Sequence, residues 1–321
     1  MERVLITGGS GFIGSHLARE LFLKGYNARI ADIEPRSYVK EKHCNEQLTL
    51  DLRIFENCLT ATKNVDVVYN LAANMGGIGF ITRVGAEVMR DNILINANML
   101  EASRLNRISR YLFSSSACVY PTYRQMDTKV VGLKEEHAYP ADPDSFYGWE
   151  KLYSEKMCEA YHRDHGMDIR IVRFHNIYGP EGVYDGGREK SPAALCRKVA
   201  ETVNNGKIVI WGDGKQTRSY CYIDDAVRGT MMLMKSDWEK PMNIGSDRLV
   251  TIDELADEII RISGKNLTKE YDSSAAQGVR GRNADIRLAK KVLDWEPEVT
   301  LEDGLARTYK WIEDQVMKKR S

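Results

Sequence analysis

The sequence lacks an excess of charge of either sign. Its 321 residues carry 46 basic and 46 acidic side chains, so the formal net charge is zero. A nucleic-acid-binding surface or an attraction to anionic membranes is therefore not expected, because both depend on positive charge. The sequence also lacks a long apolar run: Met1 to Arg3 lead directly into a strand-like segment, without the apolar core of a signal peptide, and no stretch approaches membrane-spanning length. We expect a soluble, cytoplasmic protein.

Paired cysteine motifs are missing as well. The six cysteines are scattered, with no C-x-x-C spacing and no nearby histidine cluster: Cys44, Cys58, Cys118, Cys158, Cys196 and Cys221. We therefore expect reduced thiols rather than disulfides, and no metal site. Five of them are interpreted as packing residues, whereas Cys118 lies in a motif and is interpreted separately.

Short apolar runs alternate with amphipathic helical stretches over the first 115 residues. This is the pattern of a parallel sheet covered on both faces, so we expect an α/β fold with a doubly wound parallel Rossmann sheet. Strands are predicted at 4–6, 27–32, 67–71, 111–115 and 169–174, and helices at 13–24, at about 87–105 and at about 149–165. Beyond residue 179 the loops lengthen, which predicts a smaller C-terminal α/β domain over 179–321, and the first domain, 1–178, is expected to include about 219–242 as well. Capping boxes at Thr251 and Thr300 predict two helix starts there.

A glycine-rich turn lies between the first predicted strand and the first predicted helix. Gly8, Gly11 and Gly14 have the spacing G-x-x-G-x-x-G. Such glycines allow a tight turn and let a pyrophosphate approach the backbone N–H groups at the start of the helix, here at Phe12 and Ile13. The turn therefore predicts a dinucleotide site.

Three residues at the ends of later strands are predicted to face the same cofactor. Asp32 ends the second strand, where a carboxylate accepts hydrogen bonds from the adenosine ribose and repels a 2′-phosphate. This favours NAD over NADP, although Arg36 leaves NADP open. Asp51 and Leu71 follow the next two apolar runs; for Asp51 the alternative is a turn residue or a helix cap.

Tyr147 and Lys151 lie four residues apart on a predicted helix and so share one face. The ammonium can sit beside the phenol and favour its ionised form, which would make the tyrosine an acid/base group. The pair alone is weak evidence, because a chain with 16 tyrosines produces it by chance and a solvated helix face would look the same. Its weight comes from its position downstream of the glycine turn and of the segment 114–118, SSSAC.

Several segments together resemble the extended short-chain dehydrogenase/reductases, and the resemblance covers essentially the whole chain. They are the glycine turn, 51–52 (DL), 70–73 (NLAA), 115–120 (SSACVY), 147–151 (YGWEK) and 173–180 (RFHNIYGP). The segments 211–218, 222–225 and 243–246 resemble the nucleotide-sugar branch of that family. Within it, 75–80 (MGGIGF), 186–194 (GGREKSPAA) and 278–283 (GVRGRN) are similar to the GDP-mannose 3,5-epimerases. Asn74, where an acidic residue is expected, and a short C-terminal end depart from that pattern.

The resemblance implies NAD as the cofactor, GDP-mannose as the substrate and a second domain that binds the nucleotide sugar. The implied reaction oxidises C4, inverts C5 and C3 and reduces C4 again, giving GDP-L-galactose and some GDP-L-gulose. Tyr147, Lys151 and Ser116 would act at C4, and Cys118 and Lys190 would be the acid/base pair for the inversions. Without the resemblance, Cys118 would be interpreted as a packing residue and Lys190 as an exposed loop charge. A homodimer through the two long helices is implied by the same analogy.

The remaining candidates are assigned to the substrate. The full set expected to contact the nucleotide sugar is Gly76, Ser116, Ala117, Cys118, Asn176, Glu189, Lys190, Lys198, Gln216, Thr217, Arg218 and Arg282. Arg280 is a further candidate for the diphosphate, because guanidinium groups bind phosphate oxygens in bidentate fashion, and Tyr120 is interpreted as a substrate or cofactor contact. Any one of the arginines or Lys198 could instead be a surface charge.

Two alternatives remain open. One is another NAD-retaining nucleotide-sugar enzyme, either a C4 epimerase, which needs no carbon acid/base pair, or a 4,6-dehydratase, which would show an acidic pair at Ala117 and Cys118. The other is a non-catalytic NAD-binding protein on the same fold. Intact Tyr147, Lys151 and Cys118 argue against the second.

Overall fold

The computed structural model describes residues 1–35 and 43–320. Arg36, the residue that left NADP open, lies outside the described residues. None of the helices in the described part of the chain is long and apolar enough to cross a lipid bilayer.

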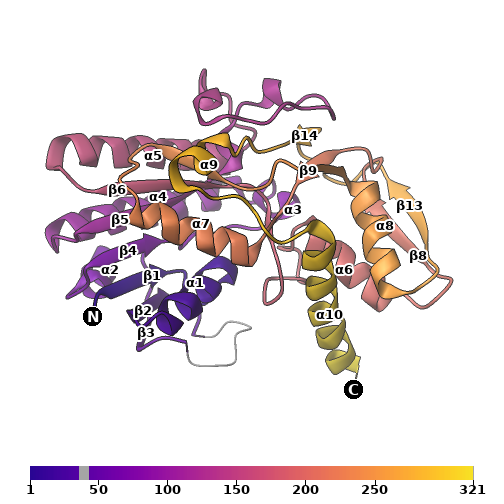
Figure 1. Ribbon diagram of the computed structural model, residues 1–321, viewed down its shortest axis with the longest axis horizontal. Coiled ribbons are helices and arrows are strands. Elements are labelled where there is room, and N and C mark those ends of the chain that lie inside the picture. The colour runs from indigo at the N-terminus through magenta and orange to yellow at the C-terminus, as the bar shows by residue number, and fades with distance from the viewer. Residues whose placement is uncertain (36–42, 321) are drawn as a thin grey trace.

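The centre of the molecule is a seven-stranded parallel sheet (Figure 1). Its strands, in spatial order, are β11 (Pro241–Ile244), β6 (Ile169–Phe174), β5 (Arg110–Ser116), β4 (Val67–Asn70), β1 (Arg3–Thr7), β2 (Asn27–Asp32) and β3 (Glu46–Thr49). The chain runs outward from β1 to β3 and then returns to β4 on the other side. The carboxyl ends of β1 and β4 therefore border the topological switch point, where doubly wound folds bind their ligands.

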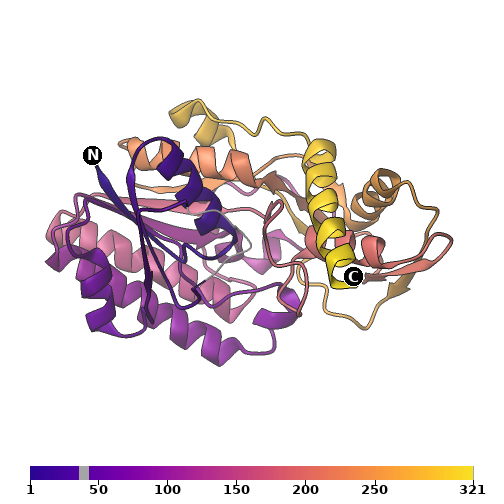
Figure 2. The same cartoon turned by 90° about the horizontal axis from the view of Figure 1, so that it is seen from below.

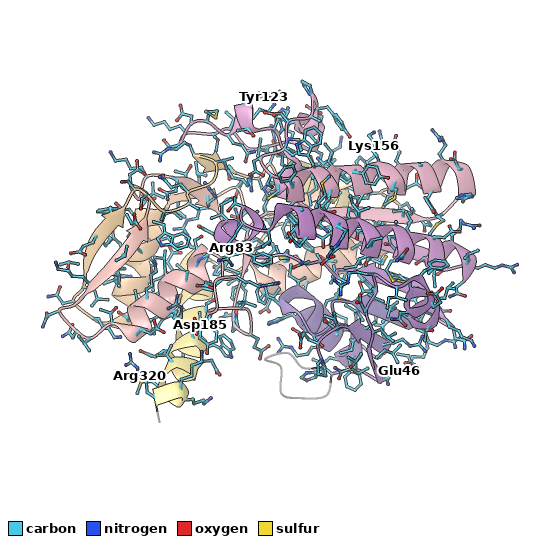
Figure 3. All side chains as sticks on the ribbon, turned by 180° about the vertical axis from the view of Figure 1, so that it is seen from behind. Glu46, Arg83, Tyr123, Lys156, Asp185 and Arg320 are labelled. Carbon is cyan, nitrogen blue, oxygen red and sulfur yellow. The ribbon has the colours of Figure 1, made fainter. Side chains whose placement is uncertain are left out.

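Helices cover both faces of this sheet, as Figure 2 shows. One face carries α1 (Phe12–Leu23), α7 (Ile223–Lys235) and α9 (Arg287–Leu293); the other carries α2 (Phe55–Thr62), α4 (Gly85–Leu105) and α5 (Phe146–His165). Figure 3, seen from behind, has α4 and α5 in front of the sheet, with Lys156 on α5. The pleat divides the core between the two faces: Val4 and Ile6 of β1 join one apolar cluster and Leu5 joins the other.

The rest of the chain forms smaller sheets and three helices that pack on one another beside the Rossmann sheet. The helices are α6 (Ser191–Glu201), α8 (Ile252–Ser263) and α10 (Leu301–Arg320), and the short α3 (Ile78–Ile81) precedes α4. The small sheets pair β12 (Leu249–Thr251), β9 (Thr217–Ser219) and β14 (Gly281–Arg282); β13 (Thr268–Asp272) with β8 (Lys207–Trp211); and β10 (Cys221–Tyr222) with β7 (Ile177–Tyr178). β9 and β14 bring their loops to the carboxyl edge of the large sheet, because Thr217 donates to the Thr128 carbonyl and Arg282 reaches Cys118.

The predicted fold class is confirmed, and each predicted strand and helix is present with its boundaries shifted by a few residues. Helix α1 stops one residue before Lys24, and Gly25 follows with a φ of +83°. The capping box at Thr251 is complete, since its hydroxyl accepts from the Glu254 N–H and the Glu254 carboxylate accepts from the Thr251 N–H. At Thr300 the hydroxyl accepts from the Asp303 N–H at 3.2 Å.

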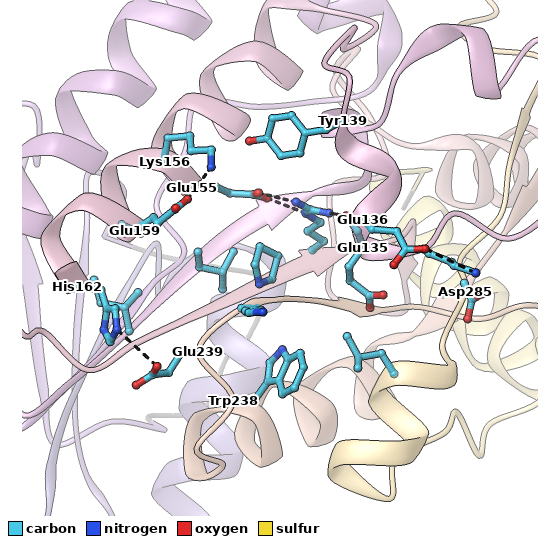
Figure 4. A pocket seen from close by; sticks show the side chains of 18 of the residues that line it. Glu135, Glu136, Tyr139, Glu155, Lys156, Glu159, His162, Trp238, Glu239 and Asp285 are labelled. Atoms are coloured by element: carbon cyan, nitrogen blue, oxygen red, sulfur yellow. Dashed lines mark hydrogen bonds and ion pairs between the residues drawn. The ribbon is translucent and has the colours of Figure 1, made fainter.

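An ion pair is buried between α5 and β6. The Arg173 guanidinium donates to both carboxylate oxygens of Glu155, at 2.8 and 2.6 Å, and both side chains are at most 5% exposed (Figure 4). Ser115 of β5 donates to the same carboxylate. The pair therefore joins three neighbouring elements through one carboxylate that is almost wholly buried.

We expect Glu155→Ala to lower the free energy of unfolding by about 3–5 kcal/mol, because it leaves the Arg173 charge buried without a partner. Urea unfolding followed by circular dichroism measures the change. The control is the double variant Glu155→Leu with Arg173→Met, which removes both charges and should lose clearly less stability than the single variant. A single variant as stable as the wild type would contradict the expectation.

Candidate functional site

The glycine turn is shaped for close approach of a ligand. Gly8 has a φ of +65°, and a Cβ on Gly14 would lie 2.1 Å from the Gly8 carbonyl oxygen, so neither position accommodates a side chain. Helix α1 begins at Phe12, and its first backbone N–H groups are not used within the helix. The hydroxyl of Ser10 is buried without a hydrogen-bond partner beside them. The turn therefore fits a pyrophosphate, and Gly8, Gly11, Phe12, Ile13 and Gly14 would hold it.

Asp32 stands beside this turn, at the end of β2. Its carboxylate accepts from the Ser10 N–H at 2.9 Å and from the Glu34 N–H at 3.0 Å, which fixes it where the ribose of a dinucleotide would lie. Leu71 follows β4, and its N–H donates to the Thr7 hydroxyl at the end of β1. These residues and the glycine turn together fit NAD.

Asp51 is held by a neighbour instead of being left free. Arg53 donates to its carboxylate from Nε and Nη2, at 2.9 and 2.7 Å, and also from the backbone N–H. These hydrogen bonds hold the pKa of Asp51 below its usual range. Arg53 also reaches Asp91 of α4, so Asp51 belongs to a small charged network at this strand end.

Tyr147 and Lys151 lie together in the first turns of α5, as the spacing predicts. Both are buried, and the Lys151 ammonium lies 5.6 Å from the centre of the Tyr147 ring. The expectation that the lysine favours the phenolate stays a prediction. Burial raises the pKa of Tyr147 well above its usual value, and the hydrogen bond with Ser116 opposes this shift. The Lys151 ammonium also lies 3.8 Å from the Glu150 carboxylate.

Cys118 lies just beyond β5, in a short 3₁₀ helix over Ala117–Val119, where Ala117 is buried. The Ser116 hydroxyl accepts from the Cys118 N–H at 3.2 Å, and a Cβ on Gly148 would lie 2.1 Å from the Cys118 carbonyl oxygen. The first turn of α5 thus rests directly on the backbone of Cys118. Ser116, Tyr147 and Cys118 are therefore brought into one place.

Arg282 of β14 reaches into the same place from the other part of the chain. Its Nη1 donates to the Cys118 sulfur at 3.3 Å, and its side chain is 8% exposed. Burial alone would lower the pKa of Arg282. Cys118 and Asp144 outweigh this effect and hold the pKa of Arg282 above its usual range. The guanidinium thus lies in direct contact with the Cys118 sulfur.

Lys190 lies at the start of α6 and belongs to the same electrostatic group. Burial lowers its pKa, Arg282 lowers it further and Cys118 opposes the shift. An amine with a lowered pKa exchanges protons more readily near neutral pH. The structure therefore groups Cys118, Lys190 and Arg282, which lie far apart in the sequence.

Several predicted substrate contacts are already engaged within the protein. Arg218 donates to the carbonyls of Thr217 and Val279, each at 2.7 Å, and burial lowers the pKa of Arg218 to about 10. Arg280 pairs with Asp213. These arginines shape the loop at 277–280, so phosphate binding would have to compete with those contacts.

The other predicted contacts border the same region. Gln216 leaves its side-chain oxygen buried without a partner, and Lys198 donates to the Val209 carbonyl at 2.7 Å while lying 5.5 Å from the centre of the Trp211 ring. Thr217 is buried, and Asn176, with a φ of +41°, donates to the Ser219 carbonyl. Glu189 accepts from Arg197, and Gly76 packs against Phe80.

Tyr120 is a correction. It is fully buried, its hydroxyl donates to Asn243 at 2.6 Å, and it accepts from Arg173. It therefore supports the sheet from within and is not placed to contact a substrate or cofactor. The motif alone gave no sign of this, because the partner on β11 is far away in the sequence.

Two residues at the site had no signal in the sequence. Gln125 and Asp144 hold the Arg282 guanidinium, with Nε 2.6 Å from Gln125 Oε1 and Nη2 2.5 Å from Asp144 Oδ2. Both residues lie in the long connection between β5 and α5. They fix the plane of the guanidinium and so the direction in which it meets Cys118.

A cavity of about 900 Å³ lies elsewhere, between α5, the edge of β11 and α9 (Figure 4). It is lined by mixed charges and by Trp238, and it contains none of the predicted site residues. The chemistry belongs instead to the carboxyl edge of the sheet, where the acid/base side chains meet.

Comparisons with known proteins show the family to which the chain belongs. The model of the NAD dependent epimerase/dehydratase family matches residues 4–245. GDP-mannose 3,5-epimerase of Arabidopsis thaliana is 45% identical over 320 residues, which cover 99% of this chain and 84% of that protein. The structure of UDP-glucose 4-epimerase from Thermotoga maritima, solved with UDP-glucose, matches with a TM-score of 0.86 at 27% identity, over 98% of this chain and 99% of that one. The structure of UDP-glucuronic acid 4-epimerase from Bacillus cereus was solved with UDP-glucuronic acid and NAD. It matches with a TM-score of 0.83 at 27% identity, over 98% of this chain and 100% of that one.

The family resemblance inferred from the motifs is therefore confirmed. The matched segment spans the positions of the glycine turn, Cys118, the Tyr147/Lys151 pair and Lys190, and the match to the Arabidopsis protein covers 99% of the chain. The chain belongs to the NAD dependent epimerase/dehydratase family.

Proposed function

We propose that this protein converts GDP-mannose to GDP-L-galactose, with some GDP-L-gulose, by inverting C5 and C3 of the sugar. The observation that carries the proposal is the meeting of Cys118, Arg282 and Lys190 beside the Tyr147 phenol and Ser116. A C4 epimerase needs no such carbon acid/base pair. The 45% identity to a GDP-mannose 3,5-epimerase over almost the whole chain supports the same substrate.

The chemistry explains why both sets of residues stand together. A hydrogen on a sugar carbon is too weakly acidic for a side chain to remove unless the neighbouring carbon is a ketone. NAD, when bound, supplies the oxidation of C4 and its later reversal. Tyr147, whose phenolate the neighbouring Lys151 ammonium and a bound oxidised nicotinamide would favour, takes the C4 hydroxyl proton in the first direction and returns it in the second, and Ser116 holds the same oxygen.

Cys118 and Lys190 then act on the carbons on either side of that ketone. Cys118, which lies beside the Arg282 guanidinium, removes a proton from C5 as the thiolate, and the Lys190 ammonium delivers one to the opposite face of the ring, which inverts the centre. The same exchange at C3 inverts the second centre. Met75, Ile78 and Phe80 pack around Tyr147 and Cys118 and give this part of the site an apolar wall.

Domain roles and location complete the proposal. Residues 1–178, with about 219–242, would bind NAD, and 179–321 would mainly bind the nucleotide sugar. A cytoplasmic location is supported by Cys58, Cys158, Cys196 and Cys221, which are buried free thiols and would suit a reducing compartment.

A homodimer through α4 and α5 is part of the proposal. The outer side of α5 exposes Phe146, Trp149 and Tyr153, at 63, 43 and 53%, and α4 exposes Leu94 at 41%. Residues spaced three and four apart share a helix face, so they form an apolar stripe suited to a second copy of the chain.

With GDP-mannose in heavy water, we expect deuterium at C5 and C3 of the recovered sugar but not at C4. The side chains at C5 and C3 exchange their protons with solvent, whereas the C4 hydrogen stays within the site during oxidation and reduction. Nuclear magnetic resonance of the recovered nucleotide sugars locates the label. Label at C4 would contradict the internal return, and turnover of a UDP-sugar with no label from GDP-mannose would indicate the C4 epimerase alternative.

Cys118→Ser should retain C4 oxidation but lose inversion by about 10²- to 10⁴-fold, the usual effect of losing an acid/base group. A hydroxyl is a much weaker base than a thiolate, while Tyr147, Lys151 and Ser116 are unchanged. Deuterium wash-in at C5 measures inversion, and the absorbance of reduced nicotinamide in a single turnover measures oxidation. Near-normal wash-in would assign the base to another residue.

Sedimentation should show a dimer for the wild type, and a monomer for the double variant Trp149→Glu with Tyr153→Glu. Two charges on the stripe make its burial against a second copy unfavourable. The control is Val203→Glu, which places a charge on an apolar residue that is 73% exposed after α6, far from the stripe. A monomeric wild type at micromolar concentration would refute the dimer.

A further inference from the structure

The segment 74–80, which follows β4, lies directly against the segment 186–190, which carries Lys190. The Gly77 N–H donates to the Arg188 carbonyl at 2.9 Å. A Cβ on Gly77 would lie 2.4 Å from the Glu189 carbonyl oxygen, so the two backbones approach to a distance that only glycine allows. In Figure 3, Arg83 and Asp185 locate the neighbourhoods of these two segments.

The Arg188 side chain reinforces this contact. Its guanidinium carbon lies 3.9 Å from the centre of the Phe80 ring, within the range of a cation–π interaction. Its Nη1 donates to Asn74 Oδ1 at 3.3 Å and lies 3.5 Å from the Met75 carbonyl oxygen. The Arg188 side chain thus contacts the segment 74–80 at the Phe80 ring, the Asn74 amide and the Met75 carbonyl.

Lys190 lies between Arg188, with its contacts to the segment 74–80, and the start of α6. On its C-terminal side, the Ser191 hydroxyl forms a hydrogen bond with the Tyr220 hydroxyl at 2.7 Å. On its N-terminal side, Gly186 and Gly187 have φ values of +88 and +83°, and a Cβ at either position would have no neighbouring atom within 4 Å. Arg188 and Glu189 are therefore the side-chain anchors next to this glycine pair, since Glu189 accepts from the Gly187 N–H and from Arg197.

The same loop is tied to the helix that carries Tyr147. The Asn74 N–H donates to Asn92 Oδ1 at 2.6 Å, and Asn92 Nδ2 donates to Glu150 Oε1 at 2.8 Å. Glu150 stands next to Lys151 on α5. The loop that Arg188 contacts is therefore hydrogen-bonded, through Asn92, to the helix that carries Tyr147 and Lys151.

We propose that Arg188 is a positioning residue that holds Lys190 at the reach and angle needed to protonate the sugar carbons. This rests on the proposed function. The segment 75–80, which resembles that of the GDP-mannose 3,5-epimerases, then supports the loop that carries Lys190. It also forms a wall of the sugar site. Arg188 itself does not touch the reacting carbons.

Arg188→Ala tests this, with Arg83→Ala as the matched control, because Arg83 is an exposed arginine just after α3. We expect deuterium wash-in at C5 and C3 from GDP-mannose to fall at least about 10-fold, since a small misplacement of a catalytic group costs up to about 10²-fold. The rate at which nicotinamide is reduced in a single turnover should stay within about twofold of wild type, because Tyr147, Lys151 and Ser116 are held by other contacts. Arg83→Ala should leave both rates unchanged.

Gly77→Ala gives a second, independent disturbance of the same contact and should show the same separation of the two rates. Thermal unfolding of each variant verifies that it is folded. Wild-type wash-in in Arg188→Ala overturns the proposal, and so does an equal loss of oxidation and wash-in in both variants, which indicates a general disturbance of the site. A wild-type protein that neither reduces nicotinamide nor exchanges deuterium with GDP-mannose refutes the proposed function itself, which distinguishes the two failures.

Discussion

The carboxylate of Glu150 is the constraint on which the site depends. It is wholly buried, and burial raises its pKa, so a stable fold must supply it with hydrogen-bond donors. Asn92 and Asn96 of α4 donate to its two oxygens, and Lys151 lies 3.8 Å away. Because donors from α4 can meet this carboxylate in only one register, the two helices are locked together, and Tyr147 on the same turn of α5 is fixed against the end of β5.

The same lock extends to the centre of the sheet. Asn96 accepts from Asn70 at the end of β4, and Asn70 accepts from Thr7 at the end of β1. Thr7 in turn receives the Leu71 N–H beside the glycine turn. A continuous chain of buried hydrogen bonds therefore joins the dinucleotide turn to the helix of the acid/base tyrosine. Such a chain is stable only when every member is satisfied, which makes the relative placement of these two parts specific.

Burial acts in opposite directions on the two acids of the site. It raises the pKa of the Tyr147 phenol and lowers the pKa of the Lys190 ammonium, because low polarity disfavours whichever form is charged. Both groups are thereby moved toward their neutral forms. Arg282 is different, since Cys118 and Asp144 compensate its burial and keep it charged. Arg282 thus brings a positive charge to the Cys118 sulfur.

The sequence predicted what local patterns encode. The period of the apolar residues predicted β1, α1 and β2. The spacing of Gly8 from Gly11 and Gly14 predicted the cofactor turn, and the spacing of Tyr147 from Lys151 predicted that both residues share one face of a helix. The family resemblance added Cys118 and Lys190, which no spacing connects. Contacts between loops far apart in the chain could not be predicted in this way. Asp144 and Arg188 look like ordinary surface charges until folding brings Arg282 and Phe80 to them.

The support of Lys190 has a consequence for the order in which the molecule can be completed. Helix α6 begins right after this lysine and buries Leu195 and Val199 against α10, a helix that contributes Tyr309 and Ile312 to the same core. During synthesis the Rossmann sheet can form its hydrogen bonds while α10 has not yet left the ribosome. At that stage α6 lacks its contact with α10. A nascent chain can therefore form the dinucleotide turn before α6, and Lys190 with it, is fixed in place.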